Sequence, residues 1–184
     1  MRPPDAKTTN PAILAIVEAY ISTPPPPHRD PTAPPVPYRT TEIDRARRDY
    51  LNAFFDGFTS PGNQTMTSND ARYYGFLAGQ DFRSRNLAPE EEVMRSFGFE
   101  PVAVRGQVFF ERLSALGLEF SPMENPGVRW EIDLLHKEGW PARNELKNGL
   151  EVVLRGYLSS DRYYGSRWMG DRKIFVIKTE VLTH

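Results

Sequence analysis

The segment 155–173 combines residue types that bind other macromolecules. It carries five cationic and two acidic side chains, a local charge of +3 in a chain whose net charge is −1. Arginine together with aromatic residues is favoured at protein interfaces, and the same mixture forms stacking platforms for single-stranded nucleic acid. A plainer interpretation is that the aromatic side chains fold back and cap one end of a sheet. We predict a binding surface formed by Arg155, Tyr157, Arg162, Tyr163, Tyr164, Arg167 and Trp168.

Two acidic residues, Glu131 and Asp133, alternate with apolar residues and are predicted to share the polar face of one strand. Their Cα atoms would lie about 6.5–7 Å apart. A carboxylate pair at this distance suits acid–base chemistry on a glycosidic bond, so a carboxylate-dependent hydrolase is one alternative. Arg129 on the same face favours an ion-paired outer surface instead.

Metal and cofactor chemistry has little support in the sequence. The chain has no cysteine, which excludes disulfides, thiolate metal sites and cysteine nucleophiles. His136 lies near Asp133 and Glu138, but one histidine with two acids is a poor metal site. Phosphate-binding glycine motifs and the common hydrolase motifs are absent. We therefore predict a protein without enzymatic activity, cofactor or metal.

Composition limits the class of protein. The chain has 184 residues, of which 39% are hydrophobic and 26% are charged, enough for a packed core in one medium domain or two small ones. A net charge of −1 disfavours a protein devoted to binding the nucleic acid backbone. No apolar run reaches the roughly 18–20 residues that cross a membrane. We predict a soluble protein without a membrane span, in a bacterial cytoplasm or periplasm, with the compartment left open.

The first 39 residues divide into a helix and a linker. Asn10 and Pro11 are typical of a helix N-cap and first turn, and the spacing of Ile13, Val17 and Tyr20 predicts an amphipathic helix over Pro11–Ser22. We expect residues 1–23 to form a docking helix, which packs on its own chain or on a second copy in a homo-oligomer. Residues 24–39 form a proline-rich linker, because proline lacks the N–H and restricts φ.

Residues 40–98 have the period of helices, predicted at 42–58, 69–85 and 89–98. A short motif recurs in the first two, as Ala53-Phe54-x-x-Gly57 and Gly75-Phe76-x-x-Gly79. Small residues at these spacings let two helix backbones approach closely. We expect a tightly packed antiparallel helix pair, in a helical region of two or three packed helices.

After Gly98 the period changes to two. Strands are predicted at 102–110, 118–120, 128–134, 150–158 and 174–181, with Trp130 facing the core and Glu131 facing solvent. Gly106 and Gly156 fall where a curved sheet would bend. Five strands with a longer excursion between the third and fourth are the order expected of a Greek-key barrel of the OB type. Residues 99–184 are therefore predicted to form an OB-like β-barrel.

The sequence as a whole predicts an α+β protein with a helical N-terminal half and a five-stranded OB-like barrel in its C-terminal half. The expected function is non-enzymatic binding, above all recognition of another protein, as in bacterial accessory, immunity or envelope proteins. The weaker alternatives are an OB-type binder of single-stranded nucleic acid and a hydrolase using Glu131 and Asp133.

Overall fold

The computed structural model describes residues 7–22, 40–60, 70–110, 117–160 and 172–182. They form four helices followed by five strands, so the α+β class, the helical N-terminal half and the five C-terminal strands are confirmed. Contacts divide the chain into a helical unit within Pro4–Phe97 and a β unit within Gly98–His184. In the described part of the chain, none of the helices is long and apolar enough to cross a membrane.

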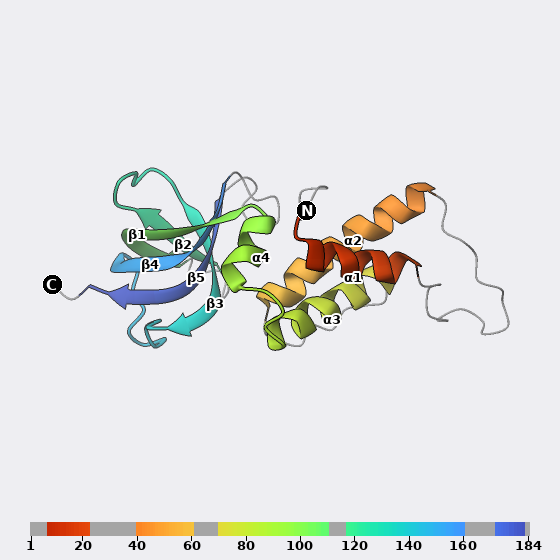
Figure 1. The fold of residues 1–184 in the computed structure, drawn as a ribbon. Coiled ribbons are helices and arrows are strands. Elements are labelled where there is room, and N and C mark those ends of the chain that lie inside the picture. The colour runs from red at the N-terminus through yellow and green to blue at the C-terminus, as the bar shows by residue number, and fades with distance from the viewer. Residues whose placement is uncertain (1–6, 23–39, 61–69, 111–116, 161–171, 183–184) are drawn as a thin grey trace. The chain divides into compact units, whose positions relative to one another are not determined.

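The helical unit begins with α1 (Pro11–Ser22), whose first turn is capped by Asn10. Asn10 Oδ1 accepts a hydrogen bond from the backbone N–H of Ala12 at 3.0 Å, which satisfies one of the free donors at the helix start. Ile13 and Val17 are buried, and the ring of Tyr20 lies 4.8 Å from that of Tyr50 on α2. The apolar stripe of α1 is therefore used for packing within its own chain (Figure 1).

Helices α2 (Thr40–Thr59) and α3 (Asp70–Ser84) pack through their glycines. A β-carbon added at Gly57 would overlap the carbonyl oxygen of Phe76, and one added at Gly79 would overlap that of Phe54. Each copy of the recurring motif thus places its glycine against the phenylalanine carbonyl of the other copy. The predicted close approach of the two backbones is confirmed.

The expected antiparallel direction of this helix pair is wrong, because α2 and α3 run parallel. Gly75 lies against Tyr50, and Gly79, four residues later on α3, lies against Phe54, four residues later on α2. Residue numbers therefore increase in the same direction along both helices. Antiparallel packing is the rule for helices joined by short loops. The nine residues between Ser60 and α3 can extend about 3.3 Å each, which is enough to return along a helix that rises about 1.5 Å per residue. The short helix α4 (Glu90–Ser96) completes the unit.

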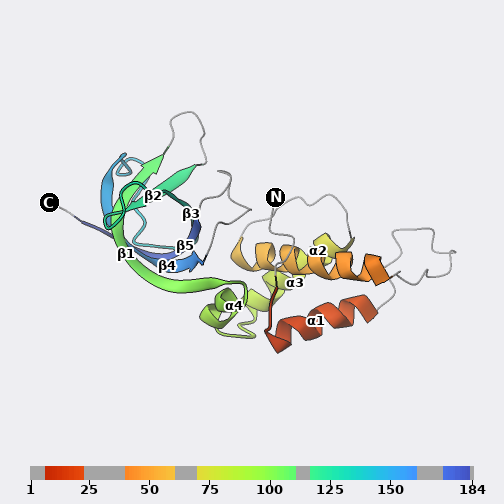
Figure 2. The same ribbon diagram turned by 90° about the horizontal axis from the view of Figure 1, so that it is seen from above.

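The β unit contains β1 (Phe99–Phe110), β2 (Leu118–Pro122), β3 (Trp130–Glu138), β4 (Leu150–Ser159) and β5 (Arg172–Val181). β1 pairs with β2 along one edge and with β4 along the other, and both pairings are antiparallel. β3 pairs with β5 in parallel, and β4 pairs with β5 antiparallel. The order β1-β2-β3-β5-β4 therefore closes on itself, and the long curved β1 is visible in Figure 2.

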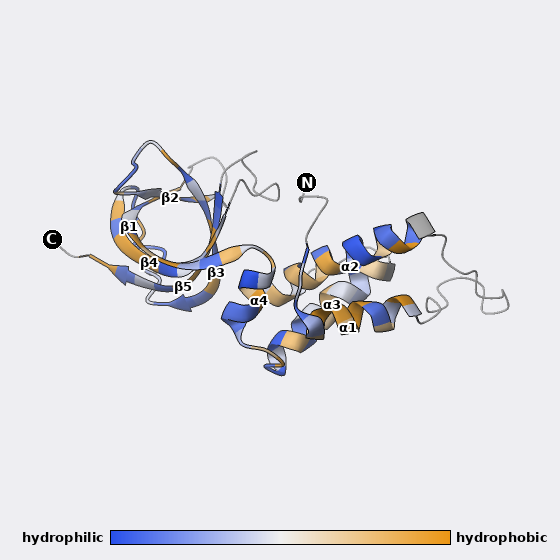
Figure 3. Cartoon of the chain, turned by 45° about the horizontal axis from the view of Figure 1, so that its top comes forward, coloured by the Kyte–Doolittle hydropathy of each residue, from blue (hydrophilic) through white to orange (hydrophobic). Residues whose placement is uncertain are grey.

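Alternate side chains fill the inside of this closed sheet. Trp130 is 7% exposed and packs on Phe120, with ring centroids 5.6 Å apart, so its predicted place in the core is confirmed. Hydrophobic and hydrophilic residues intermingle along the strands in Figure 3, as expected when one face is packed and the other is not. The buried core contains Val108, Phe120, Trp130, Ile132, Val152, Leu154, Leu158, Ile174 and Val176.

The strand registers connect one row of outward-facing residues around the sheet. Phe109 on β1 pairs with Glu119, Glu119 with Glu131, and Glu131 with Lys173. The backbone N–H of Lys173 donates to Ser159 Oγ, and Ser159 pairs with Phe99. The row thus returns to β1 ten residues before its start, which is the stagger that a closed, tilted sheet requires.

The α2–α3 packing predicts that Gly79→Ala destabilises the helical unit by about 1–3 kcal/mol, the usual cost of overpacking. A methyl group there meets backbone, which cannot rotate away. The measurement is chemical denaturation followed by far-UV circular dichroism. Gly127→Ala is the matched control, because its nearest neighbouring atom lies 3.9 Å from the added carbon. Equal stability of the two variants would contradict the packing.

A second prediction concerns Tyr50, whose burial raises its pKa from 10.0 to about 12. Between these values the unfolded chain loses the phenolic proton and the folded chain keeps it, so stability falls as pH rises. Tyr50→Phe removes this contribution. The variant should gain about 1 kcal/mol relative to the wild type between pH 9 and pH 11 in urea denaturation. A constant difference across this range would show that the phenol is not desolvated.

Candidate functional site

The predicted binding surface is only partly covered by the described residues. Five of its members, Arg162, Tyr163, Tyr164, Arg167 and Trp168, lie outside them. Arg155 is exposed on the outer face of β4, where it pairs in register with Lys178. Tyr157 lies on the same face but is 5% exposed, opposite Phe175. Of the two described residues, Arg155 is therefore the accessible one.

Hydrogen bonds hold together the residues that flank the 160–171 connection. Ser159 Oγ accepts from the backbone N–H of Lys173 at 2.9 Å, and Arg172 Nε donates to the carbonyl oxygen of Ser159 at 2.8 Å. The guanidinium of Arg172 also lies 5.5 Å from the ring centroid of Trp130. The segment that carries most of the predicted binding residues therefore begins and ends at one fixed point on the sheet.

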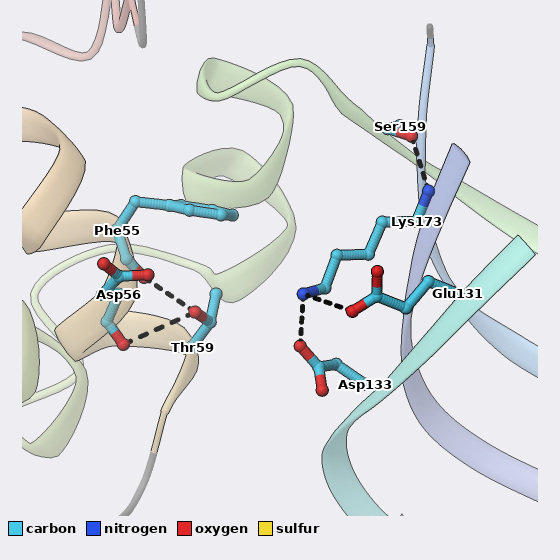
Figure 4. Close-up of polar contacts among 7 residues, drawn as sticks. All are labelled: Phe55, Asp56, Thr59, Glu131, Asp133, Ser159 and Lys173. Atoms are coloured by element: carbon cyan, nitrogen blue, oxygen red, sulfur yellow. Dashed lines mark hydrogen bonds and ion pairs between the residues drawn. The ribbon is translucent and has the colours of Figure 1, made fainter. Parts of the chain in front are cut away.

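Lys173 is the centre of a charged cluster on the outer face of β3 and β5. Its Nζ lies 2.5 Å from Asp133 Oδ2 and 3.5 Å from Glu131 Oε1, and Figure 4 shows the ammonium between the two carboxylates. The side chains of Lys173 and Glu131 are each 10% exposed, whereas that of Asp133 is 52% exposed. The cluster joins two buried opposite charges to one carboxylate that reaches water.

The expectation that Glu131 faces solvent is wrong. Its place on the outer face was predicted correctly from the alternation, but the side chain is buried there. The alternation of apolar and polar residues distinguishes the two faces of a strand, but it does not show whether the outer face is exposed to solvent. The cation opposite Glu131 was also beyond sequence reasoning, because Lys173 becomes its neighbour only through the parallel β3–β5 pairing.

Arg129 does not pair with these acids as the sequence suggested. Its guanidinium carbon lies 4.0 Å from the ring centroid of Phe109, a cation–π contact between the β2–β3 connection and β1. Arg129 is half-buried, and its Nη1 is buried without a hydrogen-bond acceptor among the described residues. Sequence reasoning placed Phe109 on the outer face but did not predict its contact with Arg129. That contact depends on the registers of the β1–β2 and β2–β3 pairings, which the sequence does not give.

The other residues of this face are mostly neutralised. Arg105 on β1 forms a salt bridge with Glu151 on β4, with Nε 2.6 Å from Oε1. Within the described ranges no group of three histidine or acidic residues is placed to hold a metal ion, and His136 is exposed on β3. The face therefore carries an arginine–aromatic pair and a salt-bridge cluster.

Comparison with known proteins adds no identity. No protein-family model matches the chain, and no curated protein matches its sequence.

The buried cluster predicts that Glu131→Gln lowers stability by about 1–3 kcal/mol, because the buried ammonium of Lys173 loses one of its two carboxylates. Glu138→Gln is the control. It removes a carboxylate from Lys178, but both partners are more than half exposed and such pairs contribute about 0–1 kcal/mol. Denaturant titration of both variants measures the difference. If the two variants lose the same stability, the Glu131–Lys173 pair is solvated and the site is described wrongly.

Proposed function

We propose that this protein is a non-enzymatic binding protein that recognises another protein through the outer face of an OB-type barrel. The observation that carries the proposal is the half-buried Arg129–Phe109 pair, whose neighbouring cations Arg105 and Lys173 are already paired with acids. Arginine and aromatic residues are the types that contribute most binding energy at protein interfaces.

Strand connectivity supports the OB-type assignment. In that architecture five strands form a Greek-key barrel, and ligands bind across strands 2 and 3 between the 1–2 and 4–5 connections. Phe109 lies at the end of β1 next to the first of these connections, and Arg129 immediately precedes β3. Ser159 and Lys173 flank the second connection. The arginines and tyrosines of 161–171 belong in sequence to the connection between these two residues.

Electrostatics favour a protein over a nucleic acid as the partner. Single-stranded nucleic acid is bound in a positively charged groove that follows its phosphates. On the outer face of β1–β3, Arg105 is neutralised by Glu151, and Lys173 lies between Glu131 and Asp133. Glu119, and not a cation, is the residue that faces Glu131 in register on β2. Nucleic acid stays an alternative partner because of the positive charge of Arg155 and of the arginines within 161–171.

The hydrolase alternative has less support. An acid–base pair needs two carboxyl groups that are free to reach a substrate. Glu131 is buried beside Lys173, and Asp133 lies 2.5 Å from the same ammonium. Both carboxylates therefore serve the salt-bridge cluster.

Photo-cross-linking in the native host tests the proposal. A benzophenone amino acid replaces Gln107, which is half-buried on the outer face of β1, or Arg143, which is exposed in the β3–β4 connection and serves as the control. Illumination should give a nuclease-resistant, protease-sensitive adduct from position 107 and much less from position 143. Adducts that disappear with nuclease would favour the nucleic-acid alternative. An absence of adducts at position 107 would contradict binding at this face.

A further inference from the structure

The geometry points to one chemical group on the partner: we propose that Arg129 binds a carboxylate, from an acidic side chain or a chain terminus, at the outer face of β1–β3. This inference rests on the proposed function and specifies what that face recognises. It follows from the surroundings of a single guanidinium.

The contact with Phe109 positions the guanidinium. With Cζ 4.0 Å from the ring centroid, one face of the cation is covered by the ring. Guanidinium N–H groups point outward in the plane of the group, so the ring takes none of the five donors in the direction in which they bond. Such stacking leaves the fork of donors available and restricts its motion, which favours two-point recognition of a planar acceptor.

The hydrogen bonds that this fork needs are missing from the protein. Nη1 is buried and has no acceptor among the described residues, although buried donors are paired in the great majority of cases. A buried donor that also belongs to a charged group is costly to leave unpaired. The residue as a whole keeps partial exposure, so the rest of the guanidinium can be approached from outside. A ligand carboxylate would bond those accessible donors and neutralise the charge that the buried Nη1 shares.

Charge selects a carboxylate among the acceptors. A neutral carbonyl would leave the positive charge of Arg129 uncompensated, whereas a carboxylate neutralises it and accepts two parallel N–H bonds. A chain of phosphates needs several cations, but Arg105 and Lys173 are already paired with acids. One carboxylate matches the one unpaired guanidinium that the described part of this face presents.

A titration of the full chain followed by nuclear magnetic resonance tests the assignment. The probes are an acetylated, amidated peptide with three central glutamates, the same peptide with glutamines, inorganic phosphate and an oligothymidylate. The glutamate peptide should shift the Nε–Hε signal of Arg129 and the amide signals of Phe109 and Glu119 until saturation. The glutamine peptide should leave them unchanged. A stronger response to phosphate or to the oligothymidylate than to the glutamate peptide would overturn the assignment, as would no response to any probe.

Variants separate binding from a structural role. Arg129→Met keeps an unbranched apolar side chain against Phe109 and removes the charge and the buried donor. It should abolish the response to the glutamate peptide while the melting temperature stays the same or rises. Arg129→Lys keeps the charge without the fork and should bind roughly tenfold more weakly. Arg143→Met, in an exposed connection, should bind like the wild type. A lower melting temperature of Arg129→Met with an unchanged titration would mean that Arg129 only supports the fold.

The two proposals fail in different ways. If the photo-adduct at position 107 forms equally well with Arg129→Met, the carboxylate assignment is overturned and protein recognition stands. If the adduct does not form with the wild-type residue at position 129, the proposed function itself is contradicted.

Discussion

Close approach of two backbones at Gly106 and Gly156 is the constraint on which the β unit depends. A β-carbon at Gly106 would overlap Ser121 and the ring of Phe120, and one at Gly156 would overlap the carbonyl oxygen of Phe175. Both positions lie where long strands change neighbours or register: β1 passes from pairing with β4 alone to pairing also with β2, and the β4–β5 register shifts at Gly156. These bends let five strands close with a ten-residue stagger around an apolar core.

The stagger decides which outward residues become neighbours. It brings Phe109, Glu119, Glu131 and Lys173 into one row, although they come from four strands. Lys173 is stabilised between two carboxylates, and Arg129 rests on Phe109 instead of joining them. The outer face of this row thereby carries a neutralised cluster around Lys173 and, at Arg129, a guanidinium whose donors are not all used. Recognition is proposed at the second of these places.

Local sequence patterns predicted the helices and strands. The direction of α3 and the burial of Glu131 depend on contacts between residues distant in sequence, which such patterns do not contain. Asn10 and Pro11 marked the start of α1, and the alternation around Trp130 identified the core face of β3. The repeated glycines indicated close helix packing, but the direction of α3 depends on the reach of a connection that has no periodic signal. Glu131 was predicted on the correct face and wrongly expected in water, because the alternation does not show that the parallel β3–β5 pairing places Lys173 beside it. The sequence also favoured a surface at 161–171, of which Arg155 and Tyr157 alone fall within the described residues.

The closure of the sheet is the central claim: the parallel β3–β5 pairing places Lys173 beside Glu131, and the β1–β4 pairing returns the row to β1. Cross-strand nuclear Overhauser contacts in the isotope-labelled full chain measure both pairings at once. The closed sheet predicts contacts in a parallel pattern between Ile132 and Ile174, together with antiparallel contacts between Val104 and Leu154. If either set is missing, the sheet is open, and if the Ile132–Ile174 contacts are the missing ones, Lys173 does not lie beside Glu131.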